Sequence, residues 1–194
     1  MIKHLVLSGG GPAGLLTYGT LCELNKKSYW KLADIISIHG CSIGAFMGLV
    51  ISLNYDWDVL DDYFIKRPWD KVAKLNSDNI VQAFTSIGLY DNEIIDISLE
   101  PLLTAKGLSC KTTLKELYEF TGIDLVIYTT NLNTSSLDAI SLCHNSHPTL
   151  PISTAIAMSM AVPILFKPIF YDGGCYIDGG CTSNFPITNC ISKQ

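Results

Sequence analysis

The sequence predicts an α/β fold with a mainly parallel sheet that helices cover on both faces. Two short apolar runs that favour strands each lead through a glycine turn directly into an apolar segment with helical spacing. Strands that enter helices through such short turns are typical of parallel sheets buried on both faces. A chain of 194 residues is also of the size that forms one core. We therefore expect a single domain over residues 1–194.

The two N-terminal units are expected to share the order strand, glycine turn and helix. Their ranges are 4–7, 8–14 and 15–24 in the first unit, and 35–38, 40–44 and 45–53 in the second. Residues 55–122 change character, with aromatic and acidic segments that favour helices. We interpret them as a helical insertion or cap on the sheet.

The remainder of the chain returns to short strands and one compact helix. The expected elements are strands at 125–130 and 139–143, a helix at 152–160, and a hairpin with strands at 169–171 and 175–177. The hairpin strands flank Asp172-Gly173-Gly174, a turn in which positive φ angles are permitted. We therefore expect the chain to close on an antiparallel pair.

The composition argues against several classes of protein. The longest apolar stretch, residues 43–53, is about half of what a membrane-spanning helix needs. The N-terminal apolar run meets Gly9 before it could form a signal-peptide core, so we expect no secretion by that route. A net charge of -5 without a large Lys/Arg cluster argues against nucleic acid as a partner.

The cysteines indicate a reducing compartment. Seven of them are scattered without a C-x-x-C pair or metal-ligand spacing, so we expect no metal site. Reduced thiols favour a cytoplasmic protein. Peripheral association with membranes is a further hypothesis, which rests on aromatic residues of the expected cap. The alternative is that these residues pack in the core. Those residues are Trp57, Tyr63, Phe64, Trp69, Phe84 and Tyr90.

Ser42 is the best candidate for a nucleophile. Gly40-Cys41-Ser42-Ile43-Gly44 fits G-x-S-x-G and lies between an expected strand and an expected helix, which is the setting of a nucleophile elbow. A serine on so sharp a turn has a strained backbone, and Gly40 and Gly44 let neighbouring chains pass without Cβ clashes. A chance match to a five-residue pattern is the alternative.

A glycine-rich loop at residues 8–14 is a candidate oxyanion hole. It follows a strand and opens a helix, so the N–H groups of Gly9, Gly10 and Gly11 can point to one spot and hold the negative oxygen of a tetrahedral intermediate. With Gly14 the loop also fits G-x-G-x-x-G, a nucleotide-binding pattern.

The nucleotide-binding interpretation lacks one part. A dinucleotide fold needs an acidic residue at a strand end about twenty positions further on, and Asp34 precedes a strand instead of ending one. A nucleotide-binding α/β protein and a simple structural turn stay as alternatives for the loop.

Histidine is a poor candidate for the base that Ser42 needs. In an α/β-hydrolase the histidine comes last in the order Ser, Asp or Glu, His, but no histidine follows His147. We expect His39 to be packed beside the elbow, and His144 and His147 to be exposed in a loop.

Asp178 is the better candidate for the base. It follows a short apolar strand, and we expect it at the carboxyl end of a parallel strand, where such folds bind ligands. Gly179 and Gly180 would let the chain turn away and bring the carboxylate to the serine hydroxyl. A turn-forming Asp-Gly pair is the alternative.

The chain resembles the patatin-like phospholipase family, because it has a glycine-rich loop, then G-x-S-x-G and then a late D-G-G, in that order. Residues 155–166, AIAMSMAVPILF, are similar to the family's A-x-x-A-S-x-A-x-P-x-x-F stretch, and Asn184-Phe185-Pro186 is similar to the N-x-P that follows its D-G-G. Two features depart from the family: Ala13 stands where members carry Arg or Lys, and the chain ends soon after Pro186, as either a minimal member or a piece.

The resemblance implies a three-layer α/β/α fold and a dyad of Ser42 and Asp178. It implies hydrolysis of acyl esters in a membrane phospholipid or another lipid, without calcium or another cofactor. Two alternatives stay open within the same fold: a lipid-binding protein with negligible turnover, and an acyltransferase that uses the same dyad.

Overall fold

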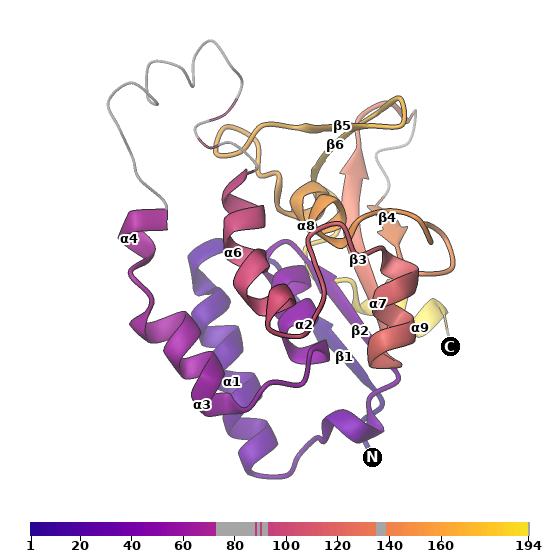
Figure 1. Cartoon of the computed structure of the whole chain (residues 1–194). Coiled ribbons are helices and arrows are strands. Elements are labelled where there is room, and N and C mark those ends of the chain that lie inside the picture. The colour runs from indigo at the N-terminus through magenta and orange to yellow at the C-terminus, as the bar shows by residue number, and fades with distance from the viewer. Residues whose placement is uncertain (73–87, 89, 91–92, 135–138, 194) are drawn as a thin grey trace.

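The computed structural model describes the chain apart from residues 73–87, 89, 91–92, 135–138 and 194 (Figure 1). Its strands are β1 (His4–Leu7), β2 (Ser37–Cys41), β3 (Asp124–Asn131), β4 (Ala139–Leu142), β5 (Ile169–Tyr171) and β6 (Gly174–Asp178). Its helices are α1 (Gly14–Lys26), α2 (Ile43–Ser52), α3 (Trp57–Asp61), α4 (Trp69–Val72), α6 (Glu93–Thr104), α7 (Leu114–Thr121), α8 (Ile152–Met160) and α9 (Ile187–Ser192).

The strands form one mixed sheet in which β1 pairs with β2, β2 with β3, β3 with β6 and β6 with β5, and β4 also pairs with β3. β1, β2 and β3 are parallel, as the two strand-turn-helix units predict. β4 and β6 run antiparallel to β3, and β5 and β6 form the antiparallel hairpin expected at the end of the chain. The parallel arrangement is thus confirmed for the first three strands, and the later strands make the sheet mixed.

Helices lie on both faces of the sheet, which confirms the α/β class. Because successive strand residues point to opposite faces, Ile38 and Leu125 join the main core on one side. Val126 and Tyr128 belong to a smaller cluster on the other side. α2 and α8 pack on the sheet with the main core, and α9 contacts β1.

The second strand begins two residues later than expected because the chain first makes a 3₁₀ turn. The turn spans Leu32–Asp34, and the N–H of Ile35 closes it on the carbonyl oxygen of Leu32. Ile35 therefore does not join the ladder, and β2 extends instead to Cys41, directly before the candidate nucleophile.

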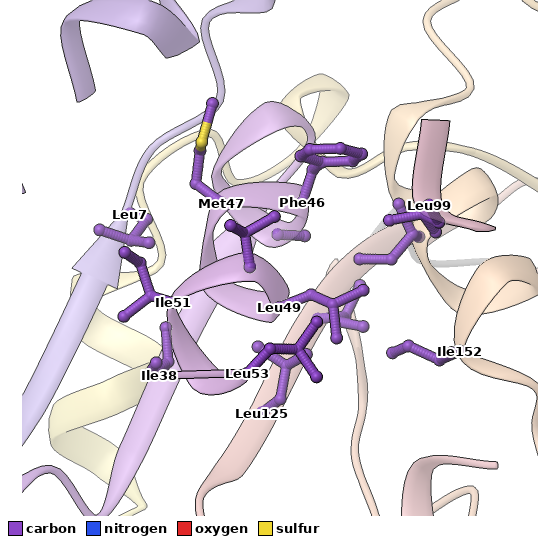
Figure 2. Packing of buried hydrophobic residues seen from close by; sticks show 14 of the residues in the cluster. Leu7, Ile38, Phe46, Met47, Leu49, Ile51, Leu53, Leu99, Leu125 and Ile152 are labelled. Carbon is purple, nitrogen blue, oxygen red and sulfur yellow. The ribbon is translucent and has the colours of Figure 1, made fainter. Parts of the chain in front are cut away.

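The main core surrounds α2. All of α2 after its first residue is buried, and a helix that is apolar on every side belongs in the interior of a fold. Figure 2 shows its side chains among those of the neighbouring strands and helices: Leu7, Ile38, Phe46, Met47, Leu49, Ile51, Leu53, Leu99, Leu125 and Ile152. This packing fixes the position of the N-terminus of α2. Ser42 directly precedes that N-terminus.

Within the segment 55–122 the described residues form the helices α3, α4, α6 and α7, with turns and loops between them. A π-helical turn at Asp62–Lys66 continues α3, and α6 packs against α8. Leu60, Leu99 and Leu117, from three helices of this segment, are buried in the same core as the sheet. The insertion is therefore part of the helical layer and contributes to the core.

Candidate active site

Ser42 lies at the point where β2 ends and α2 begins. Its backbone has φ 53° and ψ -128°, which is uncommon for any residue but glycine and stores strain. The turn is closely packed against the end of β1: a Cβ on Gly44 would lie only 2.4 Å from the carbonyl oxygen of Leu7. The serine is therefore held at the N-terminus of a buried helix, in the manner of a nucleophile elbow.

The register of β3 brings Asp178 to Ser42. Cys41, the last residue of β2, pairs with Tyr128, and Asp178, the last residue of β6, pairs with the next residue, Thr129. β2 and β6 lie along the same edge of β3, because β4 pairs with Tyr128 and Thr129 from the other edge. The ends of β2 and β6 therefore meet, and the two candidate groups come together.

The expected path of Asp178 to this place was wrong in one respect. β6 runs antiparallel to β3, so Asp178 does not end a parallel strand. The hairpin instead carries the chain beyond the carboxyl ends of the parallel strands, and β6 runs back along β3 (Figure 1). Asp178 still lies at the carboxyl ends of the parallel strands, but it reaches them from the opposite direction.

Ser42 and Asp178 are both nearly buried, each with 5% of its surface exposed. Burial raises the pKa of the Asp178 carboxyl, while hydrogen bonds from the Ser42 side chain and the Gly180 N–H act in the opposite direction. The Gly180 N–H donates to Oδ1 at 2.6 Å. Oδ2 is buried and makes no hydrogen bond of regular geometry within the described residues.

The glycine-rich loop lies beside the nucleophile. A Cβ on Gly9 would lie 3.1 Å from the Cβ of Ser42 and 2.4 Å from Oδ1 of Asn184. The Gly9 N–H donates to the Asn184 carbonyl oxygen at 3.0 Å, so its expected role as an oxyanion donor is corrected to that of an anchor for the loop. In the described part of the chain, the N–H groups of Gly10 and Gly11 have no such backbone acceptor.

The remaining motif glycines share one structural role, because a side chain at any of them would collide with a neighbour. A Cβ would lie 2.2 Å from Ile43 Cγ1 at Gly14, 2.6 Å from Ala45 Cα at Gly40, 2.2 Å from the Tyr128 carbonyl oxygen at Gly179, and 2.8 Å from Asp178 Oδ1 at Gly180. These contacts draw the loop, the elbow and the base into one compact unit.

An apolar cavity of about 280 Å³ opens next to this unit. Gly11 of the loop and Ile43, the residue after Ser42, both line it. Most of its other walls come from α2, α6 and the segments around them: Leu15, Phe46, Met47, Phe64, Trp69, Ile94, Ile95, Ser98, Met160 and Phe166. A cavity with walls of this kind suits a hydrocarbon chain.

A family model described as patatin-like phospholipase matches residues 5–191 of the chain. The chain belongs to this family. "Probable lipid hydrolase 463L" of invertebrate iridescent virus 6 is 31% identical to it, and the match covers 97% of this chain and 63% of the viral protein. An uncharacterized protein of Acanthamoeba polyphaga mimivirus is 29% identical, with 96% of this chain and 61% of the viral protein covered.

The fold of the patatin-like chain also matches a solved structure. VipD from Legionella pneumophila is similar with a TM-score of 0.65 at 18% identity, and the match covers 95% of this chain and 47% of VipD. This likeness shows a shared fold. The chain spans about three fifths of the length of the two viral relatives that it matches, at 61% and 63%.

His39 of the patatin-like chain is packed, as expected. It is buried on the face of the sheet opposite the main core, where Nδ1 lies 2.9 Å from the Tyr128 hydroxyl and Nε2 lies 3.1 Å from the Ser37 hydroxyl. Burial lowers the pKa of His39 to about 4, so it is neutral at pH 7. Its hydrogen bonds hold the sheet together and do not involve Ser42.

The expectation that His144 and His147 are exposed was wrong. Both side chains are half-buried. The His144 ring stacks on Tyr118 with the centroids 3.8 Å apart, and its Nδ1 lies 2.9 Å from Asp124 Oδ1. The loop before α8 is therefore fastened to α7 and β3, which the sequence pattern does not reveal.

The aromatic residues considered for membrane contact are packed within the patatin-like fold. Phe64 is buried and contacts Tyr18 and Tyr63, and Trp69 contacts Tyr63. Phe64 and Trp69 also line the cavity. The alternative of packing aromatics is thus confirmed for these residues, and Phe84 lies outside the described residues.

Sequence reasoning missed two parts of the patatin-like site. The cavity gathers residues from segments that are far apart in the chain, and no motif marks them. Ser159 is the other: its Oγ lies 2.8 Å from the backbone nitrogen of Ser42. The only signal for Ser159 was its place in the stretch 155–166, which resembles the family.

Neither a metal cluster nor a membrane-spanning helix is found among the described residues. No group of three or more His, Cys, Asp or Glu side chains there could hold a metal ion. No helix within the same ranges is both long enough and apolar enough to cross a bilayer.

Proposed function

We propose that this chain is a lipid acyl hydrolase of the phospholipase A type, with Ser42 as the nucleophile and Asp178 as the base. The observation that carries the proposal is the strand pairing that brings the Ser42 elbow and the buried Asp178 carboxyl together beside an apolar cavity. The family match and the name of the iridescent virus relative support the same class of reaction.

Acylation begins when Asp178 accepts the proton of the Ser42 hydroxyl and the serine oxygen attacks the ester carbonyl carbon. Burial raises the pKa of Asp178, which makes it a better proton acceptor than an exposed aspartate. The carbonyl oxygen becomes negative and is held by the N–H groups of Gly10 and Gly11. The ester bond then breaks, and the leaving alcohol takes the proton from Asp178. The acyl group remains on Ser42.

Deacylation repeats these steps with water. Asp178 accepts a proton from water while the water oxygen attacks the acyl carbon, and the same N–H groups hold the negative oxygen. The bond to Ser42 Oγ breaks, the serine oxygen recovers its proton from Asp178, and the fatty acid leaves. This cycle uses no metal, so the proposal predicts that activity persists in the presence of EDTA.

A fatty-acyl chain is the substrate part that the cavity would hold. Because Gly11 and Ile43 line it, a chain in the cavity would carry its ester carbonyl toward the loop and the elbow. The net charge of -5 offers no attraction to anionic surfaces, so we propose neutral or zwitterionic lipids as substrates.

Exposed apolar side chains beside the cavity would contact a lipid surface. Leu15 lines the cavity, and the neighbouring Leu16 is 75% exposed. Ile164 is 76% exposed and lies two residues before Phe166, which also lines the cavity. We expect co-sedimentation with zwitterionic vesicles that Leu16→Asp weakens. Vesicles that retain none of the wild-type protein would count against peripheral association.

A fluorophosphonate probe tests the proposal, because it reacts only with an activated serine. We expect the probe on the peptide that contains Ser42 in the wild type, none in Ser42→Ala, and slow labelling in Asp178→Asn. Absence of labelling in the folded wild type would favour a lipid-binding protein without turnover. Lipid products formed with glycerol present separate hydrolysis, which gives free fatty acid, from acyl transfer, which gives an acylglycerol.

A further inference from the structure

The C-terminal end of α8 contacts both halves of the candidate dyad. The Ser42 N–H donates to the hydroxyl oxygen of Ser159 at 2.8 Å. Directly after the helix, the carbonyl oxygen of Ala161 accepts the Asp178 N–H at 2.9 Å. Two positions on one short segment thus bind the backbone of the nucleophile and the backbone of the base.

Hydrogen bonds to β3 also fix the C-terminal end of α8. The Ser159 hydroxyl donates to the Tyr128 carbonyl oxygen at 2.6 Å, and the Thr129 hydroxyl contacts the Met158 carbonyl oxygen at 3.0 Å. Tyr128 and Thr129 are the residues whose ladder partners are Cys41 and Asp178. The end of α8 is therefore tied to β3 at the place where β2 and β6 meet.

The Ser159 side chain suits this position because a hydroxyl can donate and accept at once. Ser159 is fully buried, so no water can replace it without a new cavity. Without its oxygen, the Ser42 N–H would have no acceptor in a turn that is already strained at φ 53°. A buried, unpaired N–H at a strained turn favours movement of that turn.

We propose that Ser159 is a positioning residue that fixes the Ser42 elbow relative to Asp178 through its hydroxyl group. This inference rests on the proposed function, since it concerns the same dyad. It gives the stretch 155–166 a role in the site: the stretch carries both Ser159 and Ala161 to the dyad. It also follows that the Ser42 N–H is engaged, which leaves the oxyanion to the N–H groups of Gly10 and Gly11.

The test compares two serines of α8. Ser159→Ala removes the hydroxyl at the elbow, and Ser153→Ala removes a similar hydroxyl, which donates to the Cys110 carbonyl oxygen at 2.9 Å. Ser153 lies six residues earlier, about 9 Å along the helix, so its loss weakens the same helix away from the dyad. The rate of fluorophosphonate labelling at Ser42 and the kcat and KM for a p-nitrophenyl decanoate ester are measured for each.

We expect Ser159→Ala to slow labelling and lower kcat by about 10- to 100-fold, because a small displacement of reacting groups has effects of this size. Its KM should stay near the wild-type value, since the cavity is untouched, and Ser153→Ala should keep both rates. If Ser159→Ala does not fold, Ser159→Cys takes its place, as its thiol is only a weak donor and acceptor.

A folded Ser159→Ala protein that labels at the wild-type rate would overturn the inference and leave the proposed function standing. An equal loss of rate in Ser153→Ala would also overturn it, because the effect would then come from the helix as a whole. A folded wild-type protein that does not label at all would remove the proposed function, and the inference with it.

Discussion

A larger side chain at Ser98 should shorten the acyl chain that the proposed hydrolase accepts. Ser98 lies on α6 and lines the cavity, and its hydroxyl donates to the Ile94 carbonyl oxygen one turn earlier at 2.7 Å. That carbonyl keeps its helical N–H partner if the hydroxyl is lost. Ser98→Leu therefore leaves no polar group unpaired, and it adds a net two non-hydrogen atoms to the wall of the cavity.

The size of the effect follows from the volume of the cavity. About 280 Å³ holds about nine groups of the size of a water molecule, at about 30 Å³ each. The two added non-hydrogen atoms would exclude about two methylene groups of the acyl chain, and each buried methylene contributes about 0.8 kcal/mol. The loss of about 1.6 kcal/mol corresponds to about 15-fold in kcat/KM for a chain that fills the cavity.

The assay compares p-nitrophenyl decanoate with p-nitrophenyl butyrate. Ser98→Leu should lose about 15-fold in kcat/KM on the decanoate ester and little on the butyrate ester, which leaves the far part of the cavity empty. Ser98→Ala, which removes the hydroxyl without filling space, is the matched control and should resemble the wild type. An equal loss on both esters would refute the assignment of the cavity to the acyl chain.

Four further outcomes are expected. Because burial raises the pKa of Asp178, kcat/KM should fall on acidification with a midpoint above about 3.9, the ordinary pKa of aspartate. A midpoint at or below about 3.9 would contradict the assignment of the buried Asp178 as the base. For the same reason Asp178→Asn should raise the thermal midpoint at pH 7. Calorimetry at several pH values should show that this gain shrinks as the pH falls below the folded-state pKa of Asp178 and is lost below about 3.9, the unfolded-state value. Gly44→Ala should lower the free energy of unfolding in urea by about 1–3 kcal/mol and abolish activity. Gly19→Ala is the control: a Cβ at Gly19 would have no neighbour within 4 Å, so the change should stabilise α1 by about 0.5–1 kcal/mol and keep full activity. His144→Ala should keep its esterase activity, and a loss of more than about tenfold would bring a histidine back as the base.

The first half of the fold could be predicted because its signals are local. Glycine turns between apolar runs mark the two strand-turn-helix units, and the same glycines at Gly40 and Gly44 mark the elbow. The bounds of β2 could not be predicted as well, since a 3₁₀ turn that closes on Leu32 takes Ile35 out of the ladder. That turn competes with the strand for the same N–H group.

The candidate site was harder to predict where it depends on contacts across the chain. Asp178 could be proposed from D-G-G, but its path along β3 depends on strand pairing, which no local pattern encodes. The engaged N–H of Gly9 depends on Asn184, which lies 175 residues further along the chain. Ser159 looks like an ordinary polar residue in an apolar helix until its two partners are known.

Fatty-acid release from phosphatidylcholine vesicles tests the account most directly. The wild type, Ser42→Ala and Asp178→Asn are compared with EDTA present throughout, after circular dichroism has shown that each is folded. The account predicts release by the wild type, none by Ser42→Ala, and a rate lowered by about 10²- to 10⁴-fold in Asp178→Asn, the usual contribution of a general base. Release by Ser42→Ala at the wild-type rate would contradict it.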